Sequence, residues 1–258
     1  MTRHNQARRR FFQRSLASMA AATLGGCDYL NSTKWFPKVL TAGESLSLSV
    51  HKTLIPRKAM AQEFTEADLS PHFRSNGTAD PDSAAYKALA RNNFADWSLQ
   101  VDGLVAKPAR FSLAQLQAMP GRTQITRHDC VEGWSAIAKW TGVPLSAVLQ
   151  ALQPGASAKY VVFHCADPMS SDGGDLYYES IDMDDAYHAQ TILAYRLNDM
   201  PLPVANGAPL RLRVERQLGY KHAKYLMRIE LASSLAHIGS GHGGYWEDSN
   251  GYQWYAGI

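Results

Sequence analysis

Between residues 97 and 232 the chain alternates short strand-like and helix-like segments. WSLQVDGLV (97–105) and PLRLRV (209–214) alternate apolar and polar residues, which is typical of half-buried strands. SLAQLQAM (112–119) and PLSAVLQAL (144–152) have helical spacing, with Ser112 as a candidate N-cap of the first. The remaining apolar segments predict strands at 159–165, 177–181, 191–197 and 225–231 and a short helix at 182–189.

The segments on either side of this pattern differ from it. Prolines and turn-forming residues interrupt residues 28–90, so we expect an irregular N-terminal arm packed on a domain of residues 91–258. Because strands and helices in that domain alternate without a repeated β–α–β unit, we predict a single-domain α+β fold with a largely antiparallel or mixed sheet. Residues 239–244 fit G-x-G-x-x-G, but we expect them to open no helix. That expectation excludes a dinucleotide-binding loop and leaves a flexible loop that presents Tyr245 and Trp246.

The basic charge of the chain belongs to residues 1–27. The whole chain has 26 Lys and Arg against 23 Asp and Glu, a formal net charge of +3. Five arginines and no acid lie in residues 1–27, so the remainder has 21 basic and 23 acidic residues, a net charge of −2 that predicts no nucleic-acid partner. Arg8 and Arg9, followed by two phenylalanines and a short apolar run ending at Cys27, resemble a twin-arginine signal with a lipobox. We therefore expect folded export to the periplasm. Lipidation of Cys27, which would be the protein's link to the membrane, and ordinary cleavage near it both stay open.

The other two cysteines, Cys130 and Cys165, are the main chemical candidates. Cys130 lies between a polar segment and an apolar, Trp-rich one. In an oxidising compartment two cysteines by default form a disulfide, which would suit a non-catalytic exported binding module. A zinc site at His128, Cys130 and Cys165 is another alternative, although zinc ligands usually come in spaced pairs. The residues by themselves leave these alternatives open.

Several motifs in order along the chain resemble the sulfite oxidase family of molybdopterin-dependent oxidoreductases. The resemblance is strongest to the exported bacterial branch, which includes the catalytic subunit of the periplasmic methionine sulfoxide reductase. It implies a molybdenum–molybdopterin cofactor that transfers an oxygen atom to or from a small S-oxo compound, with the protein binding and orienting it. The motifs are RNNF (91–94), CVEGWS (130–135), AKYVVF (158–163), LAYRLNDMPLP (193–203), NGAPLRL (206–212) and GYKHAKYL (219–226).

The resemblance also implies roles for individual residues. Cys130 matches the thiolate ligand of molybdenum, a soft ligand suited to that metal. Tyr245 matches the tyrosine beside the reacting oxygen, and Arg91 matches an arginine that holds an anionic substrate. The positions that match cofactor contacts are Asn92, Asp96, Cys165, Asn206, Arg211, His222, Ala223 and Lys224, of which the last four suit a phosphate.

Two departures from the family pattern leave the substrate undecided. Sulfite oxidases carry a basic residue where this chain has Ser135, whereas the methionine sulfoxide reductase branch lacks an arginine at the position of Arg91. We expect no haem in this chain. The enzyme would therefore need an electron-transfer partner, either a b-type membrane cytochrome or a c-type cytochrome.

Overall fold

The computed structural model describes residues 30, 32–54, 56, 58–170 and 173–258. The chain divides into two compact units, residues 1–56 and residues 57–258. The described part of the first unit is essentially one helix, α2 (Phe36–Leu54). The twin-arginine segment and Cys27 lie outside the described residues. No helix among the described residues has the length and apolar character needed to cross a membrane.

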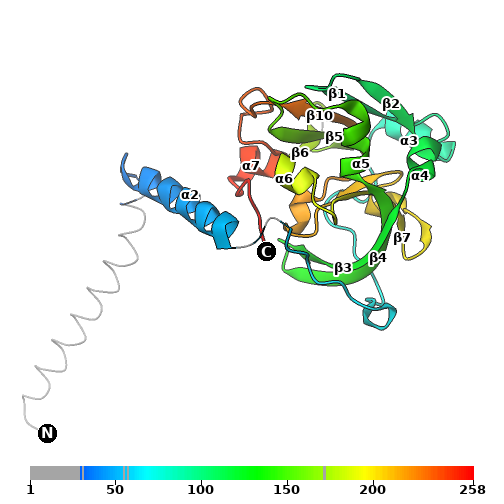
Figure 1. Cartoon of the computed structure of the whole chain (residues 1–258), viewed down its shortest axis with the longest axis horizontal. Coiled ribbons are helices and arrows are strands. Elements are labelled where there is room, and N and C mark those ends of the chain that lie inside the picture. Colours follow the sequence, from blue (N-terminus) through cyan, green and yellow to red (C-terminus); the bar gives the residue numbers. More distant parts are fainter. Residues whose placement is uncertain (1–29, 31, 55, 57, 171–172) are drawn as a thin grey trace, which may run out of the picture. The chain divides into compact units, whose positions relative to one another are not determined.

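The second unit contains two five-stranded sheets (Figure 1). One sheet has the strand order β2-β1-β10-β5-β6, in which β1 and β10 pair in parallel and all other neighbours are antiparallel. Its strands are β1 (Ser98–Gly103), β2 (Ala109–Ser112), β5 (Tyr160–Pro168), β6 (Leu176–Asp182) and β10 (Leu226–Ala232).

The other sheet is antiparallel and has the order β3-β4-β7-β8, with β9 also paired to β7. The strands are β3 (Arg122–Cys130), β4 (Trp134–Pro144), β7 (Ile192–Leu197), β8 (Met200–Pro201) and β9 (Arg211–Arg213). A mixed sheet was predicted, and the α+β class is confirmed.

One large hydrophobic core joins the two sheets. Helix α5 (Leu145–Leu152) follows β4 directly and buries Val148 and Leu149 in this core together with Val161 and Phe163 of β5. The remaining helices are α3 (Ala84–Arg91), α4 (Leu113–Ala118), α6 (Met183–Ala186) and α7 (Tyr245–Asn250), with 3-10 turns at Glu66–Asp68, Val204–Asn206 and Gly219–Lys221. Ser112 caps α4 as predicted, accepting a hydrogen bond from the backbone N–H of Gln115 at 3.2 Å.

The structure differs from the sequence predictions in three places. The hairpin β3–β4 was not predicted, and the arm at 28–90 includes two helices, α2 and α3. The expectation that the glycine run opens no helix is wrong, because α7 begins at Tyr245, directly after Gly244. Residues 58–83 of the arm pack on the rest of the second unit, where the N–H of Phe64 donates to the carbonyl of Ile125 in β3 at 2.8 Å.

Candidate functional site

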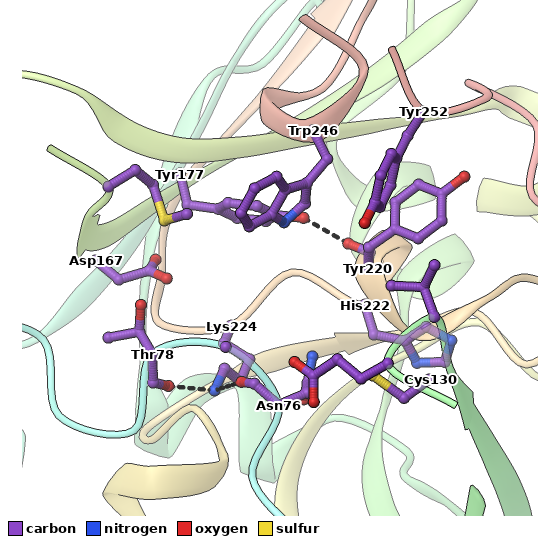
Figure 2. A pocket seen from close by; sticks show the side chains of 14 residues that line it. Asn76, Thr78, Cys130, Asp167, Tyr177, Tyr220, His222, Lys224, Trp246 and Tyr252 are labelled. Atoms are coloured by element: carbon purple, nitrogen blue, oxygen red, sulfur yellow. Dashed lines mark hydrogen bonds between the residues drawn. The ribbon is translucent and has the colours of Figure 1, made fainter. Parts of the chain in front are cut away.

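A cavity of about 250 Å³ opens beside Cys130, between the tip of the β3–β4 hairpin and the segments that follow β5 and β9 (Figure 2). Its lining combines one thiol, two carboxylates, one imidazole, one ammonium group and several aromatic rings. The lining residues are Asn76, Gly77, Thr78, Cys130, Val131, Glu132, Asp167, Met169, Tyr177, Tyr220, His222, Lys224, Trp246 and Tyr252.

The hairpin places the Cys130 thiol at the cavity. Cys130 is the last residue of β3 and pairs with Trp134, and Gly133 in the tight turn between them has φ +86°. Only 8% of Cys130 is exposed, and this burial raises the pKa of its thiol. The positive charges of Arg74 and Arg211 act in the opposite direction. A soft metal bound to the sulfur would stabilise the thiolate that burial disfavours.

Two histidine rings lie under the cavity in perpendicular contact, His128 and His222, with centroids 5.0 Å apart. Arg213 donates to Nδ1 of His128 at 2.9 Å, so the proton of this neutral ring sits on Nε2. Arg213 is itself paired with Glu215, both fully buried. Burial, followed by the neighbouring arginines, lowers the pKa of both histidines well below the usual value.

Arg211 is a fully buried cation without an ion pair among the described residues. Its guanidinium donates only to carbonyl oxygens, those of Asn206 at 3.0 Å and His222 at 3.4 Å. Desolvation lowers its pKa to about 9. Within the described chain, Nε of Arg211 and Nδ2 of Asn206 have no hydrogen-bond partner. Two buried donors are thus left without an acceptor beside an uncompensated positive charge, an arrangement that an anion would satisfy.

Lys224 is the second such cation, and its ammonium group reaches the cavity. It donates to the carbonyl oxygens of Asn76 (2.6 Å) and Thr78, which ties the segment from Ser75 to Thr78 to the cavity (Figure 2). Desolvation and the charge of Arg211 lower its pKa to about 7. No carboxylate of the described residues lies within ion-pair distance of it.

Aromatic rings and two carboxylates form the rest of the cavity. Trp246 stacks on Tyr252, and Tyr177 donates to the backbone carbonyl of Tyr220 at 2.6 Å (Figure 2). Asp167 is 4% exposed, and its Oδ1 has no hydrogen-bond partner among the described residues. Burial raises the pKa of Asp167 to about 6. The cavity therefore offers a buried acid that changes protonation near neutral pH.

Behind the aromatic residues lies a closed ionic cluster. The ammonium of Lys221 donates to Glu179 at 2.5 Å and to Glu247 at 2.7 Å, and all three side chains are at most 1% exposed. Desolvation raises the pKa of Glu179 well above its usual value, with the charge of Glu247 acting in the same direction. The positive charge is matched inside the protein, although Oε2 of Glu179 and Oε2 of Glu247 have no hydrogen-bond partner among the described residues.

The predicted site residues fall into two groups. Cys130, His222 and Lys224 line the cavity, and Arg211 and Asn206 lie directly behind His222. Of the others, Cys165 and Ala223 are buried in the core, and Tyr245 borders a different hollow with Tyr178 and Asp248. Arg91, Asn92 and Asp96 are exposed at the end of α3, where Asn92 donates to Asp96 at 2.6 Å. The roles assigned to these residues stay predictions.

The two alternatives to a redox cofactor gain no support from the geometry. Cys130 and Cys165 are both free thiols, on strands of different sheets. Among the described residues, no three His, Cys, Asp or Glu side chains are arranged to hold a metal, so the zinc site considered at His128 is not formed there.

Sequence reasoning missed most of the cavity's aromatic and acidic lining. Asp167, Tyr177, Tyr220 and Tyr252 were not singled out, and Trp246 was noted only as a neighbour of Tyr245. Tyr220 lies inside a family-like motif, GYKHAKYL, which was a usable signal. Asp167 and Tyr177 occupy strands in which only the register distinguishes a cavity position from a core one.

The residues fit a cofactor that carries both a soft metal and an anionic group. Cys130 would hold the metal, and the unpartnered donors around Arg211 and Asn206 would hold the anion, to which Lys224 contributes charge. This combination defines the class as a protein built to bind a metal cofactor with a phosphate-like tail.

Comparisons with known proteins agree with this class. Residues 86–237 match the family described as an oxidoreductase molybdopterin-binding domain. A protein of Azospira oryzae that bears the name of a protein-methionine-sulfoxide reductase subunit, YedZ1, is 36% identical over 97% of this chain and 88% of its own length. The protein-methionine-sulfoxide reductase catalytic subunit MsrP of Xanthomonas campestris is 38% identical over 64% of this chain, a match that spans about half (53%) of that protein. The sulfane dehydrogenase SoxCD of Paracoccus pantotrophus aligns with a TM-score of 0.49 and 24% identity over 54% of this chain and 39% of its own.

The chain therefore belongs to the oxidoreductase molybdopterin-binding-domain family, and its resemblance to the sulfite oxidase family is confirmed. It is a molybdopterin-dependent oxidoreductase, and its cofactor is molybdenum with molybdopterin.

Proposed function

We propose that the protein reduces a neutral organic sulfoxide, such as methionine sulfoxide, with Cys130 as the protein ligand of molybdenum. The observation that carries this proposal is the cavity beside the Cys130 thiol, where aromatic rings meet two carboxylates, Glu132 and Asp167. An apolar cavity suits a neutral sulfoxide, and in this proposal the cations Lys224 and Arg211 bind the phosphate of the cofactor and not an anionic substrate such as sulfite. The names of the relatives in Azospira and Xanthomonas support the same direction.

The stoichiometry of sulfoxide reduction determines which groups the protein must supply. Reduction breaks the S–O bond, consumes two electrons and two protons, and releases the sulfide and water. When bound, the molybdenum cofactor supplies two-electron oxygen-atom transfer. The chain's own residues bind the sulfoxide between Trp246 and Met169, exclude water and deliver protons. The electrons come from a one-electron carrier, for which we propose a b-type membrane cytochrome or a c-type cytochrome.

Asp167 is the proton donor in this proposal. Its carboxyl group lines the cavity, has an oxygen without a hydrogen-bond partner in the described part of the chain and carries a pKa raised to about 6 by burial. Only the protonated form donates, so turnover falls as the pH rises through about 6. We expect Asp167→Asn to lower kcat and to remove this pH dependence. Glu132→Gln, which changes the more exposed carboxylate of the same cavity, is the matched control and should keep it. An unchanged pH profile in Asp167→Asn would exclude this role.

The cofactor assignment is tested by metal analysis of protein made in a host that synthesises molybdopterin. We expect about one molybdenum per chain, in keeping with the single thiol at the cavity. Cys130→Ser should abolish sulfoxide reduction driven by a reduced viologen dye, and Met200→Ser, at an exposed residue that does not line the cavity, should retain it. Full activity in Cys130→Ser contradicts the ligand assignment. Faster oxidation of sulfite than reduction of methionine sulfoxide would reverse the proposed direction.

A further inference from the structure

Helix α2 has an apolar side that its own unit does not bury. Trp35, Val39, Leu46 and Val50 are 57%, 54%, 66% and 44% exposed. Of the eleven exposed large apolar side chains among the described residues, five lie between Trp35 and Val50. With about 100° per residue, Val39, Leu46 and Val50 fall within about 40° of one another on the helix, and Trp35 directly precedes its first residue. We call this stripe the apolar face of α2.

The charges on and around the helix indicate what can cover this face. Residues 34–58 contain five basic residues and a single acid, Glu44. Such a one-signed distribution repels a second copy of the same helix and attracts an anionic surface. Trp35 marks the N-terminal end of the face and contacts Phe36 edge-on, with ring centroids 5.6 Å apart. Tryptophan at the end of an amphipathic helix is favoured at the boundary between lipid headgroups and acyl chains.

We propose that α2 lies in the plane of an anionic phospholipid surface, with its apolar face toward the acyl chains. The helix adsorbs without crossing the bilayer, and electrostatic attraction adds to the burial of the apolar face. This interaction does not depend on lipidation of Cys27 or on the proposed sulfoxide reduction.

The affinity test uses sedimentation of the full chain with vesicles of phosphatidylglycerol and phosphatidylcholine in equal parts. The burial of one leucine side chain contributes enough binding free energy that Leu46→Asp should weaken binding about tenfold or more. Met200→Asp is the matched control, because Met200 is equally exposed but lies on the body. All these chains share residues 1–34, so any binding by the basic N-terminus is common to them. Equal binding by wild type and Leu46→Asp overturns the proposal.

The orientation test uses quenching by brominated lipids in the same vesicles. The quenching of Trp35 is obtained as the difference in tryptophan fluorescence quenching between the wild type and Trp35→Phe. Two reporter tryptophans, Val50→Trp and Leu48→Trp, are introduced one at a time into the Trp35→Phe chain. The helical repeat puts residue 48 about 160° from residue 50. We expect strong quenching of Trp35 and of the reporter at 50, and little at 48. Equal quenching at 48 and 50, or none at either, contradicts a helix lying flat, and the second result indicates that protein covers the face.

Discussion

Lys221 and Lys224 are three residues apart and both buried, yet their surroundings are opposite. Lys221 is held by two carboxylates, Glu179 and Glu247, at 2.5 and 2.7 Å. Among the residues that the structure describes, Lys224 has only neutral oxygen atoms as hydrogen-bond partners, and Arg211 adds a second positive charge near it. The first lysine is neutralised within the protein, and the second is not.

The difference separates a structural ion cluster from a binding site. A buried charge that the protein pairs internally stabilises the fold only as a set, whereas a buried cation paired with carbonyl groups alone costs stability until an anion arrives. In this chain the buried cation that destabilises the fold until an anion binds is Lys224, which lines the cavity with Cys130. The phosphate of molybdopterin is an anion of the right kind for it.

The largest expected effect follows from breaking the closed cluster. Lys221→Met keeps the length of the side chain but leaves two buried carboxyl groups without their cation. We expect a loss of about 3–5 kcal/mol in the free energy of unfolding. Denaturant unfolding of the cofactor-free protein measures it, and Lys159→Met, at an exposed residue, is the control. A loss below about 1 kcal/mol, the range of exposed pairs, would mean that the cluster is not closed.

A smaller effect is expected from the titration of Lys224. Its folded-state pKa of about 7 lies below the ordinary lysine pKa of 10.5, so the unfolded chain binds more protons between these values. Stability of the cofactor-free protein should therefore rise with pH in this window and be lost as the pH falls through about 7. Between pH 7 and pH 8.5, before unfolded cysteines titrate, the gain should be about 1–2 kcal/mol.

Two comparisons check this assignment. Lys224→Met should flatten the rise, because it removes the titrating group. Bound cofactor should flatten it too, because an anion beside the ammonium favours its charged form. A rise that persists unchanged in Lys224→Met would assign it to another group.

The contrast between the two lysines could not be seen in the sequence, although the motif that contains them could. Resemblance singled out His222, Ala223 and Lys224, but carboxylates 42 residues before Lys221 and 26 residues after it decide which lysine is satisfied. Charge balance in the interior depends on contacts between distant segments, which local pattern does not report.

The strands also differ in how well the local sequence pattern predicts them. Strands such as β5 have apolar core positions and were predicted, whereas β3 points Gln124, Thr126, His128 and Cys130 inward. Its burial alternates, but its hydropathy does not, because these positions face a polar network and the cavity. Hydrophobic periodicity therefore fails at the strand that carries the proposed metal ligand.

The smallest expected effect sharpens the description of the closed cluster. Desolvation raises the pKa of Glu179 well above its usual value, which favours the protonated form in the folded protein. Glu179→Gln replaces the protonated form of this acid by a neutral amide that keeps the acceptor for Lys221. It should change stability at pH 7 by less than about 1 kcal/mol, far below Lys221→Met.

The sign of the pH dependence provides the check on Glu179. A group whose pKa is raised by folding adds stability below its unfolded pKa, and this stability is lost as the pH rises toward the folded value. The wild type should therefore lose stability relative to Glu179→Gln as the pH increases from about 4.5 upward. Unfolding curves of both proteins between pH 4.5 and pH 8 measure the difference. If the two curves stayed parallel, or if Glu179→Gln were as damaging as Lys221→Met, Glu179 would be ionised, and the cluster would carry a net negative charge. The contrast with the cationic site at Lys224 would then be one of sign, because the negative charge around Lys221 would exceed its positive charge.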